Sequence, residues 1–316
     1  MGKVAFLFSG QGAQYVGMGK ELYDEVKPAR RIFEVADETL GVSISDMCFS
    51  GPKEDLDRTE NTQPAILTTS VAALRALEDH GIKPDITAGL SLGEYSALVS
   101  SGTLKFEDAV VLVKKRGRYM QEAVPEGIGA MSAIMGLDTD KVQDVCSRCS
   151  SLGIVEITNL NCPGQVVISG EKKPVKEASG LALERGARKV IELSVSGPFH
   201  TSMMKPAAEK LERQLESITF SSFEIPVITN VTGDIIEDEV HIKDYLKRQV
   251  MSTVYFERTI RNMIDTGVDT FVEIGPGRVL SGFVRKVDRK AAVLNVQDVK
   301  SLNSTIEKLK DRIGVD

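Results

Sequence analysis

The chain has 316 residues, which exceeds a typical single domain, so we expect two domains or one large domain that carries an insertion. Its formal net charge of -6 disfavours a general nucleic-acid binder, which needs a basic balance. The apolar run at the N-terminus is too short for a signal peptide, and no stretch approaches the roughly 20 apolar residues that span a bilayer. We therefore expect a cytoplasmic protein that binds neither nucleic acid nor membrane.

The first predicted element is a buried strand over Lys3 to Ser9, because near-continuous apolar residues are typical of a parallel sheet covered on both faces. The strand runs into a glycine loop, Gly10 to Gln14. This loop resembles half of a dinucleotide-binding fingerprint, but Tyr15 stands where the third glycine is required, so we discount nicotinamide binding. A glycine loop at the carboxyl end of a strand can instead direct a backbone N–H into an active cleft.

Helical periodicity follows over Glu21 to Leu40, with a break expected at Pro28. A polar, turn-rich passage then extends to Thr59. A long helix is predicted to open at Asn61-Thr62-Gln63-Pro64, with the proline in its first turn, where a missing N–H costs little, and to stop at Gly81. Its apolar residues fall on one face, so we expect that face to pack against other elements.

In the stretch Ile86 to Tyr95 a predicted strand turns sharply into a helix. Ser91 lies at the turn, Gly89 and Gly93 flank it at two residues on either side, and a helical, amphipathic segment over Glu94 to Ser100 follows. A serine on a strained strand-to-helix turn needs neighbours without side chains, so that strand and helix approach and its Oγ projects into a cleft. Ser91 is therefore a candidate nucleophile; the alternative is a serine that only caps a helix.

A further amphipathic helix is predicted over Phe106 to Gln121, and it is rich in cations. A run of this kind is usually a solvated helix face, and this is our interpretation for three of the four residues concerned. The cations are Lys114, Lys115, Arg116 and Arg118.

From Gly127 to Val195 the predicted order is strand, helix, strand, strand, helix, strand, which is the ferredoxin-like pattern. We interpret residues 127–195 as an inserted, ferredoxin-like small domain, and residues 1–126 and 196–316 as a large α/β catalytic domain. The elements expected in the insertion are the strands 130–135, 154–159, 165–169 and 189–195 and the helices 138–150 and 174–185.

Beyond the insertion, strands and helices alternate again, which implies an α/β fold with a mostly parallel sheet and helices on both faces. We describe this core as α/β-hydrolase-like. The expected elements are the strands 225–230 and 270–274, and helices around 242–251, around 256–266 and up to residue 287.

Histidines and cysteines are scarce, and only one of them is a clear candidate for chemistry. Cys146 and Cys149 form a C-x-x-C inside a helical pattern, but no second ligand pair stands at zinc spacing, so we expect reduced structural thiols and no metal site. His80 is interpreted as a helix-end residue and His241 as a solvated one. His200 differs, because a strand-like run and a Gly-Pro pair turn the chain sharply just before its imidazole.

Six motifs occur in the order and spacing of the malonyl-CoA:acyl-carrier-protein transacylases, and the chain resembles this family over nearly its whole length. Any one motif is weak, but six in order, together with an inserted β-α-β-β-α-β pattern, are highly specific. They are Phe8-Ser9-Gly10-Gln11-Gly12-Ala13-Gln14, Asn61-Thr62-Gln63-Pro64, Gly89-Leu90-Ser91-Leu92-Gly93-Glu94, the Arg116 helix, Gly197-Pro198-Phe199-His200 and Glu273-Ile274-Gly275-Pro276-Gly277.

The resemblance implies that Ser91 is the nucleophile and that His200 is the base that takes its proton and returns it to the departing thiol. In the family the histidine is oriented by a backbone carbonyl near the position that matches Gln249, so the pair is a dyad. The oxyanion would be met by the backbone N–H groups of Leu92 and Gln11.

The resemblance also implies a substrate-binding set. Arg116 matches the family's carboxylate-binding arginine, whose planar fork would hold a malonyl carboxylate in two parallel hydrogen bonds. Phe199 matches enzymes selective for malonyl units, although one methyl group is worth only roughly 1–3 kcal/mol in such a pocket. Leu90 stands where the family usually has a histidine. Further implied substrate-binding residues are Gln249, Gln63 and Asn161.

Three functions compete. The favoured one transfers malonyl from coenzyme A to the phosphopantetheine thiol of an acyl carrier protein, for fatty-acid synthesis or as a stand-alone acyltransferase of a polyketide synthase. An esterase or thioesterase would share the serine turn but would not need Arg116 in an acyl pocket, and a non-catalytic docking scaffold would need none of these groups. No cofactor is expected, because the coenzyme A thioester is a substrate and the partner carries the phosphopantetheine. We expect a monomer.

The acidic carrier is expected to meet local cations on this net-negative protein. The alternative role of such cations is solubility. The candidates are Arg185, Arg188 and Lys189 in the insertion, and Arg278, Arg285 and Lys286 in the large domain.

Overall fold

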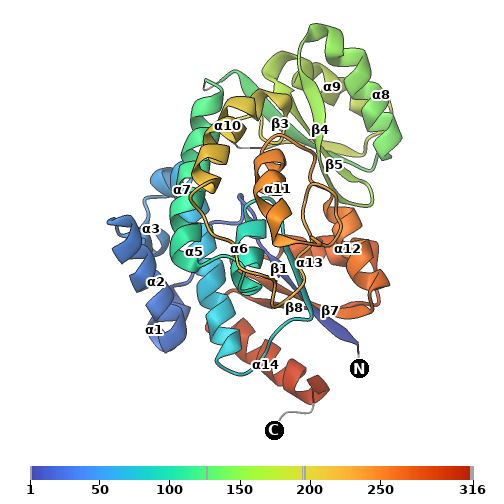
Figure 1. Ribbon diagram of the computed structural model, residues 1–316. Coiled ribbons are helices and arrows are strands. Elements are labelled where there is room, and N and C mark those ends of the chain that lie inside the picture. Colours follow the sequence, from blue (N-terminus) through green and yellow to red (C-terminus); the bar gives the residue numbers. More distant parts are fainter. Residues whose placement is uncertain (1, 126, 194, 196, 314–316) are drawn as a thin grey trace.

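The central sheet of the computed structural model has four parallel strands in the order β2-β1-β7-β8 (Figure 1). The structure describes residues 2–125, 127–193, 195 and 197–313. Phe8 lies beside Gly89 on one side and Ile274 on the other, so the loops that follow β1, β2 and β7 meet at one edge of the sheet. The strands are β1 (Lys3–Phe8), β2 (Ile86–Gly89), β7 (Val268–Ile274) and β8 (Ala292–Val296).

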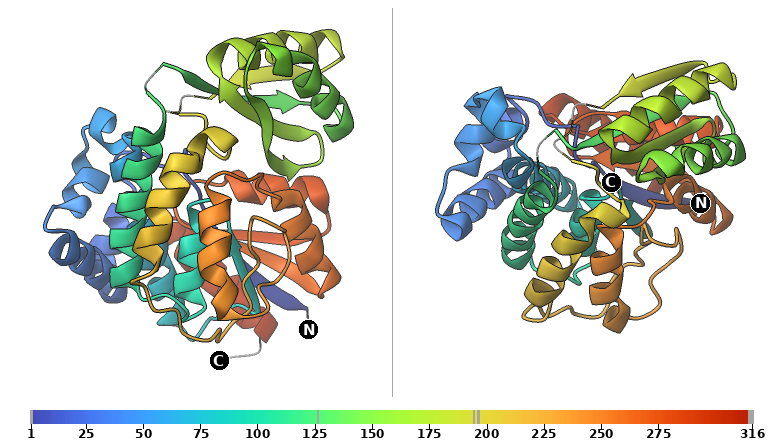
Figure 2. Two further views of the ribbon diagram at one scale, coloured as in Figure 1. Left: turned by 45° about the horizontal axis from the view of Figure 1, so that its top comes forward. Right: turned by 90° about the horizontal axis from the view of Figure 1, so that it is seen from above.

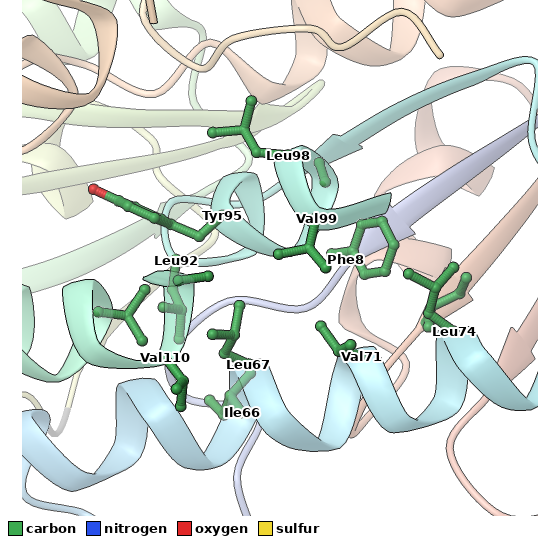
Figure 3. Packing of buried hydrophobic residues seen from close by; sticks show 14 of the residues in the cluster. Phe8, Ile66, Leu67, Val71, Leu74, Leu92, Tyr95, Leu98, Val99 and Val110 are labelled. Carbon is green, nitrogen blue, oxygen red and sulfur yellow. The ribbon is translucent and has the colours of Figure 1, made fainter. Parts of the chain in front are cut away.

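Helices cover both faces of this sheet, as the continuous apolar sequence of β1 predicts. Because successive side chains of a strand point to opposite faces, Phe6 and Phe8 enter one hydrophobic cluster, and Ala5 and Leu7 enter another. Figure 3 shows Phe8 above Val71 of the long helix α5 (Thr59–Glu78). The opposite cluster is built with α12 (Phe256–Asp265) and α13 (Val279–Val287). The predicted α/β class with a parallel sheet and helices is confirmed.

The first third of the chain is more helical than expected. The break near Pro28 is confirmed, since one helix ends at Glu25 and the next begins at Lys27. The passage expected to be turn-rich contains two short helices, the first of which is capped by the Ser43 side chain. The helices are α1 (Lys20–Glu25), α2 (Lys27–Leu40), α3 (Ile44–Ser50) and α4 (Lys53–Leu56).

Helix α5 begins two residues earlier than expected, at Thr59, so Pro64 lies in its second turn and not in its first. The additional turn is anchored by Thr62, whose Oγ1 lies 2.5 Å from the carbonyl oxygen of Leu56 and 3.1 Å from that of Arg58. This local anchoring outweighs the preference of proline for the first turn.

The helix after the serine turn, α6 (Gly93–Ser100), is buried along its entire length, so the expectation of an amphipathic segment is wrong. It packs against both α5 and α7 (Phe106–Ala123), as the grouping of Leu67, Val99 and Val110 in Figure 3 shows. On α7, Arg118 and Lys115 are exposed and Lys114 is half-buried, whereas Arg116 is buried.

A separate antiparallel sheet lies beside the parallel one, with the strand order β4-β5-β3-β6 (Figure 2). Ile134 and Ile168 of this sheet pack against its two helices, whereas Met131, Ala133 and Val167 face the main cluster. The elements are β3 (Gly129–Met135), α8 (Thr139–Cys149), the 3-10 turn Ser150–Leu152, β4 (Val155–Cys162), β5 (Gln165–Glu171), α9 (Lys172–Glu184) and β6 (Lys189–Glu192).

The cysteines are free and buried, as expected for structural thiols. Cys146 belongs to the apolar core beneath the antiparallel sheet, and burial raises the pKa of its thiol to about 12. The predicted boundaries at residues 126 and 196, and residue 194 in the last strand expected there, lie outside the described residues.

The remaining chain differs from expectation in two respects. The strand expected over 225–230 forms only isolated bridges, between Val227 and Thr87 and between Ile228 and Ile235. Pro226 lacks the N–H that would extend a ladder with β2. Three elements were not predicted, namely β8, α10 (Lys205–Leu215) and α14 (Val299–Ile313). The three predicted helices of this region are present as α11 (Ile242–Gln249), α12 and α13. Two 3-10 turns, Ser202–Met204 and Glu239–His241, precede α10 and α11.

Within the ranges that the structure describes, no helix combines the length and the apolar character that crossing a membrane requires.

Candidate active site

Ser91 lies on a strained turn between β2 and α6, with a φ of 52°. The flanking glycines are required by close packing: a Cβ on Gly89 would lie 2.0 Å from the carbonyl carbon of Gly93, and a Cβ on Gly93 would lie 2.2 Å from the carbonyl oxygen of Phe8. The backbone N–H of Ser91 donates to Oδ1 of Asn230 at 2.6 Å. The turn therefore has the geometry of a presented nucleophile.

His200 meets Ser91 from the segment that precedes α10. Its Nε2 lies 2.8 Å from the Oγ of Ser91, and its Nδ1 lies 2.7 Å from the backbone carbonyl oxygen of Gln249. Because a carbonyl oxygen only accepts, Nδ1 carries the proton and Nε2 is free to accept the serine proton. Burial, reinforced by the Arg116 charge, lowers the pKa of His200 to about 4, so the imidazole is neutral and ready to act as a base.

Arg116 projects from α7 to the same point and is 1% exposed. It donates to Oε1 of Gln63 at 2.9 Å, to Oε1 of Gln249 at 3.0 Å and to Oγ of Ser91 at 3.1 Å. Its guanidinium carbon lies 5.4 Å from the centre of the Tyr95 ring. Burial lowers the pKa of Arg116, and the nearby Tyr95 and Glu94 oppose that shift. The group is a buried cation whose partners in this structure are neutral.

A buried polar network behind Ser91 was not predicted from the sequence. The Asn230 side chain accepts from the N–H of Ser91 and donates to the carbonyl oxygen of Gly89 at 2.7 Å. Glu94, also fully buried, accepts from the backbone N–H of Asn230 at 2.9 Å and from Nε2 of Gln249 at 2.7 Å. One feature of the sequence could have identified Glu94, because it is an acidic side chain in a helix of otherwise apolar and small residues. Asn230 is distinguished only by its place at the end of an expected strand.

A cavity of about 250 Å³ opens at Ser91 between the two sheets. Phe199 and Leu90 line it on the side of the parallel sheet, and Asn161 lines it from β4. Oδ1 of Asn161 is buried and has no hydrogen-bond partner among the described residues, so it is available to a donor in the cavity. The cavity is walled mainly by apolar side chains, which suits a ligand with an apolar body and a few polar groups.

The glycine loop after β1 lines this cavity beside Ser91. A Cβ on Gly10 would lie 2.5 Å from the carbonyl oxygen of Leu90, so the loop approaches the serine turn at backbone distance. Within the described ranges, no acceptor is found for the backbone N–H of either Gln11 or Leu92. Two unpaired N–H groups near a nucleophile can receive a developing negative charge.

The structure brings together most of the predicted site residues. Ser91, His200 and Arg116 form one hydrogen-bonded group. Gln63 and Gln249 hold Arg116 and do not stand free in the cavity.

The candidate carrier-binding cations divide into two groups. Arg278 and Arg285 line a depression between α13, β8 and α14, and Lys286 donates to Gln165, which lines the cavity at Ser91. In the antiparallel unit, Arg188 and Lys189 are exposed, whereas Arg185 lies 3.5 Å from Asp144 in an ion pair.

Comparisons with a family model, with curated sequences and with solved structures all identify acyl transferases as similar to this chain. Residues 5–311 match the family model described as an acyl transferase domain. The malonyl CoA-acyl carrier protein transacylase of Bacillus subtilis is 51% identical over 312 residues, which cover 98% of each chain. The crystal structure of the malonyl CoA-acyl carrier protein transacylase of Clostridium perfringens superposes with a TM-score of 0.96 at 48% identity, over 99% of each chain. A complex of a type II polyketide synthase acyl-carrier protein with its malonyl-transacylase superposes with a TM-score of 0.95 at 40% identity, over 97% of this chain and 99% of that one.

Proposed function

The chain belongs to the acyl transferase family and within it to the malonyl CoA-acyl carrier protein transacylases, and from this we propose that Ser91 carries malonyl from coenzyme A to an acyl carrier protein. The protein is an acyltransferase, and its partners are malonyl-CoA and an acyl carrier protein. The observation that carries the roles of the residues is the contact of Ser91 Oγ with both His200 Nε2 and Arg116.

In the first half-reaction, Ser91 Oγ attacks the thioester carbonyl carbon as Nε2 of His200 takes the hydroxyl proton. The resulting oxyanion accepts hydrogen bonds from the backbone N–H groups of Gln11 and Leu92. When the intermediate collapses, the C–S bond breaks and His200 returns its proton to the departing thiol of coenzyme A. The products are malonyl-Ser91 and free coenzyme A.

In the second half-reaction, the phosphopantetheine thiol of the carrier gives its proton to His200 and attacks the Ser91 ester. The C–O bond breaks, the proton passes to Oγ, and the malonyl thioester of the carrier leaves. The reaction is therefore ping-pong, and it needs no cofactor because both thiols and the acyl group belong to substrates.

Arg116 binds the free malonyl carboxylate in this proposal. The buried fork can make two parallel charge-assisted hydrogen bonds with a carboxylate, one of which replaces the hydrogen bond that Arg116 gives to Ser91 in the structure. Phe199 and Asn161 line the path of the acyl group and the pantetheine arm. A serine esterase or thioesterase has no use for this cation, which favours acyl transfer over hydrolysis.

The finer architecture is also a proposal. It consists of an α/β-hydrolase-like core over residues 1–126 and 196–316 and an inserted ferredoxin-like domain over 127–195. The element order β3-α8-β4-β5-α9-β6 and the sheet order β4-β5-β3-β6 support the second part. The cytoplasmic location and the monomeric state stay predictions of the sequence, as does the choice between fatty-acid and polyketide acceptors.

The test of the function is intact-protein mass spectrometry after mixing the protein with malonyl-CoA alone. We expect one malonyl group per chain, located at Ser91 by peptide mapping, and its transfer when a carrier with a free phosphopantetheine thiol is added. Ser91→Ala should form no adduct. An adduct that persists on the alanine variant, or a wild-type adduct that passes to water faster than to the carrier, contradicts the proposal.

A further inference from the structure

Glu94 is a buried carboxylate that the transfer steps do not use. It is fully buried at the start of α6, three residues after the nucleophile. Its Oε2 accepts from the Asn230 backbone and from the Gln249 side chain, while its Oε1 has no hydrogen-bond partner among the described residues. A charge removed from water is costly unless another charge or several donors compensate for it, so this position requires an explanation.

Gln249 connects Glu94 to the acyl pocket through its side-chain amide. Nε2 of Gln249 donates to Glu94 at 2.7 Å, and Oε1 of the same amide accepts from Arg116 at 3.0 Å. An amide nitrogen only donates and an amide oxygen only accepts, so a carboxylate at one end fixes the oxygen toward the guanidinium at the other. The amide dipole is thereby aligned between a negative and a positive group.

Arg116 has no direct ion pair within the described part of the chain, although it is buried. Glu94 is an acidic group that acts on it across the amide, and the influence is mutual: each charge favours the ionised form of the other. Burial raises the pKa of Glu94, and the donors from Asn230, Gln249 and Thr229 and the charge of Arg116 oppose that shift.

We propose that Glu94 is the counter-charge of Arg116, linked to it through Gln249, and that it sets how strongly Arg116 holds an acyl carboxylate. The inference rests on the proposed function, because it requires Arg116 to bind the malonyl carboxylate. An arriving carboxylate is attracted by Arg116 and repelled by Glu94. The pocket therefore holds malonyl less tightly than a lone guanidinium would, which suits an enzyme that must release the group to a second thiol. Glu94 is a positioning residue, since it touches no substrate.

Two substitutions separate the charge of Glu94 from its hydrogen bonds. Glu94→Gln removes the charge and retains an oxygen for the Asn230 and Gln249 donors; its NH₂ takes the place of Oε1, where the Thr229 hydroxyl can accept from it. Glu94→Asp retains the charge but withdraws the carboxylate by one methylene, so it loses its reach to both donors.

The readout is the ratio of transfer efficiencies, kcat/KM, for malonyl-CoA and acetyl-CoA with the carrier as acceptor. Glu94→Gln should raise this ratio about tenfold over wild type and lower the KM for malonyl-CoA, as expected for the loss of a like charge one amide away. Glu94→Asp should lower both efficiencies by a similar factor and leave the ratio near the wild-type value. An unchanged or reduced ratio in Glu94→Gln overturns the proposal.

A measurement on the wild type keeps the proposal testable if Glu94→Gln does not fold. Infrared difference spectra between wild type and Glu94→Asp distinguish a carboxylate from a carboxylic acid, and a Glu94 that is protonated at neutral pH overturns the proposal.

Asp37→Asn is the matched control for the kinetic ratio, because Asp37 is a partly buried carboxylate that accepts from the N–H and Oγ of Ser45, far along the chain from the acyl pocket. Its ratio should equal that of wild type.

The two proposals fail in different ways. If wild type does not transfer malonyl in preference to acetyl, the proposed function fails. If wild type shows that preference and Arg116→Ala loses it, but Glu94→Gln leaves it unchanged, only the role of Glu94 fails.

Discussion

The two sheets contribute different chemistry to one cavity. The loop after β2 carries Ser91, helix α7 carries Arg116 and the segment before α10 carries His200, and these three side chains form one hydrogen-bonded group. Among the described residues that line the cavity, those from the antiparallel unit are apolar or amides, and none is charged. In the proposed function, the parallel-sheet side of the cavity carries out bond making and acyl recognition, and the antiparallel side positions the pantetheine thioester. Substitutions in the first should change turnover or acyl preference, and those in the second should change KM.

The largest effect is expected at the base. His200→Ala should reduce malonyl transfer about a thousandfold, within the range for loss of a general base, because no other described residue accepts the Ser91 proton. Thermal unfolding should show a folded protein. His241→Ala, at an exposed histidine, is the control and should transfer at the wild-type rate. Near-wild-type turnover in His200→Ala would mean that another base operates.

The pH dependence sharpens the same point. The acting form of His200 is neutral, and its pKa in the folded protein is lowered to about 4, so formation of malonyl-Ser91 should persist as pH falls through 6.5 and decline only near 4. The measurement is the rate of adduct formation as a function of pH. A decline centred on the ordinary histidine pKa of about 6.5 would contradict the burial argument.

The next largest effect should separate recognition from chemistry within the parallel-sheet region. Arg116→Ala should lower malonyl transfer by about a hundredfold or more, because two charge-assisted hydrogen bonds are lost, each worth roughly 1.5–3 kcal/mol. Acetyl transfer should be equal to or better than that of wild type, since acetyl has no carboxylate to bind the buried guanidinium that wild type retains. Arg118→Ala, an exposed neighbour on α7, is the control. An equal fall for both substrates would make Arg116 a structural residue.

A smaller effect is expected in the antiparallel region. Asn161→Ala should raise the KM for malonyl-CoA and for acetyl-CoA by the same factor, up to about tenfold, because one hydrogen bond to the shared pantetheine arm is lost. kcat should remain near the wild-type value. Asn303→Ala on the exposed side of α14 is the control. A change in kcat alone, or in the malonyl-to-acetyl ratio, would break the division of labour between the two regions.

The smallest effect is expected for binding of the acidic carrier protein, and the test distinguishes which of the two regions binds it. Charge reversal at Arg278, Arg285 and Lys286 should raise the KM for the carrier about threefold to tenfold at low salt and spare that for malonyl-CoA. The same experiment at Arg188 and Lys189 tests the antiparallel unit.

Lys83→Glu is the control for both sets of charge reversals. Lys83 is exposed just before β2, at the edge of the parallel sheet opposite Ser91, so its reversal should not affect the carrier. Carrier kinetics that respond to neither set, nor to salt, would place docking elsewhere or make it apolar.

The sequence by itself determined the parts of the protein that depend on local geometry. Glycines at fixed spacing around Ser91 predicted the turn. A Cβ atom at Gly89 or Gly93 would lie about 2 Å from backbone atoms of a neighbouring segment, so only glycine fits at either position. The apolar β1 predicted a sheet covered on both faces. The resemblance in six motifs supplied the proposed roles of His200 and Arg116, which no local pattern distinguishes from an ordinary histidine or a solvated arginine.

Only the tertiary structure decided which polar groups meet in the interior. Glu94, Asn230 and Gln249 lie far apart in the chain, and their hydrogen bonds depend on the packing of α6, α11 and the segment after Ile228 around one point. Tertiary packing also decided that α6 is buried throughout, that Pro64 lies in a second turn and that the segment around Pro226 forms bridges and no regular strand. For α6 and the Pro226 segment long-range contacts outweighed a local preference, and for Pro64 the side-chain hydrogen bonds of Thr62 did so.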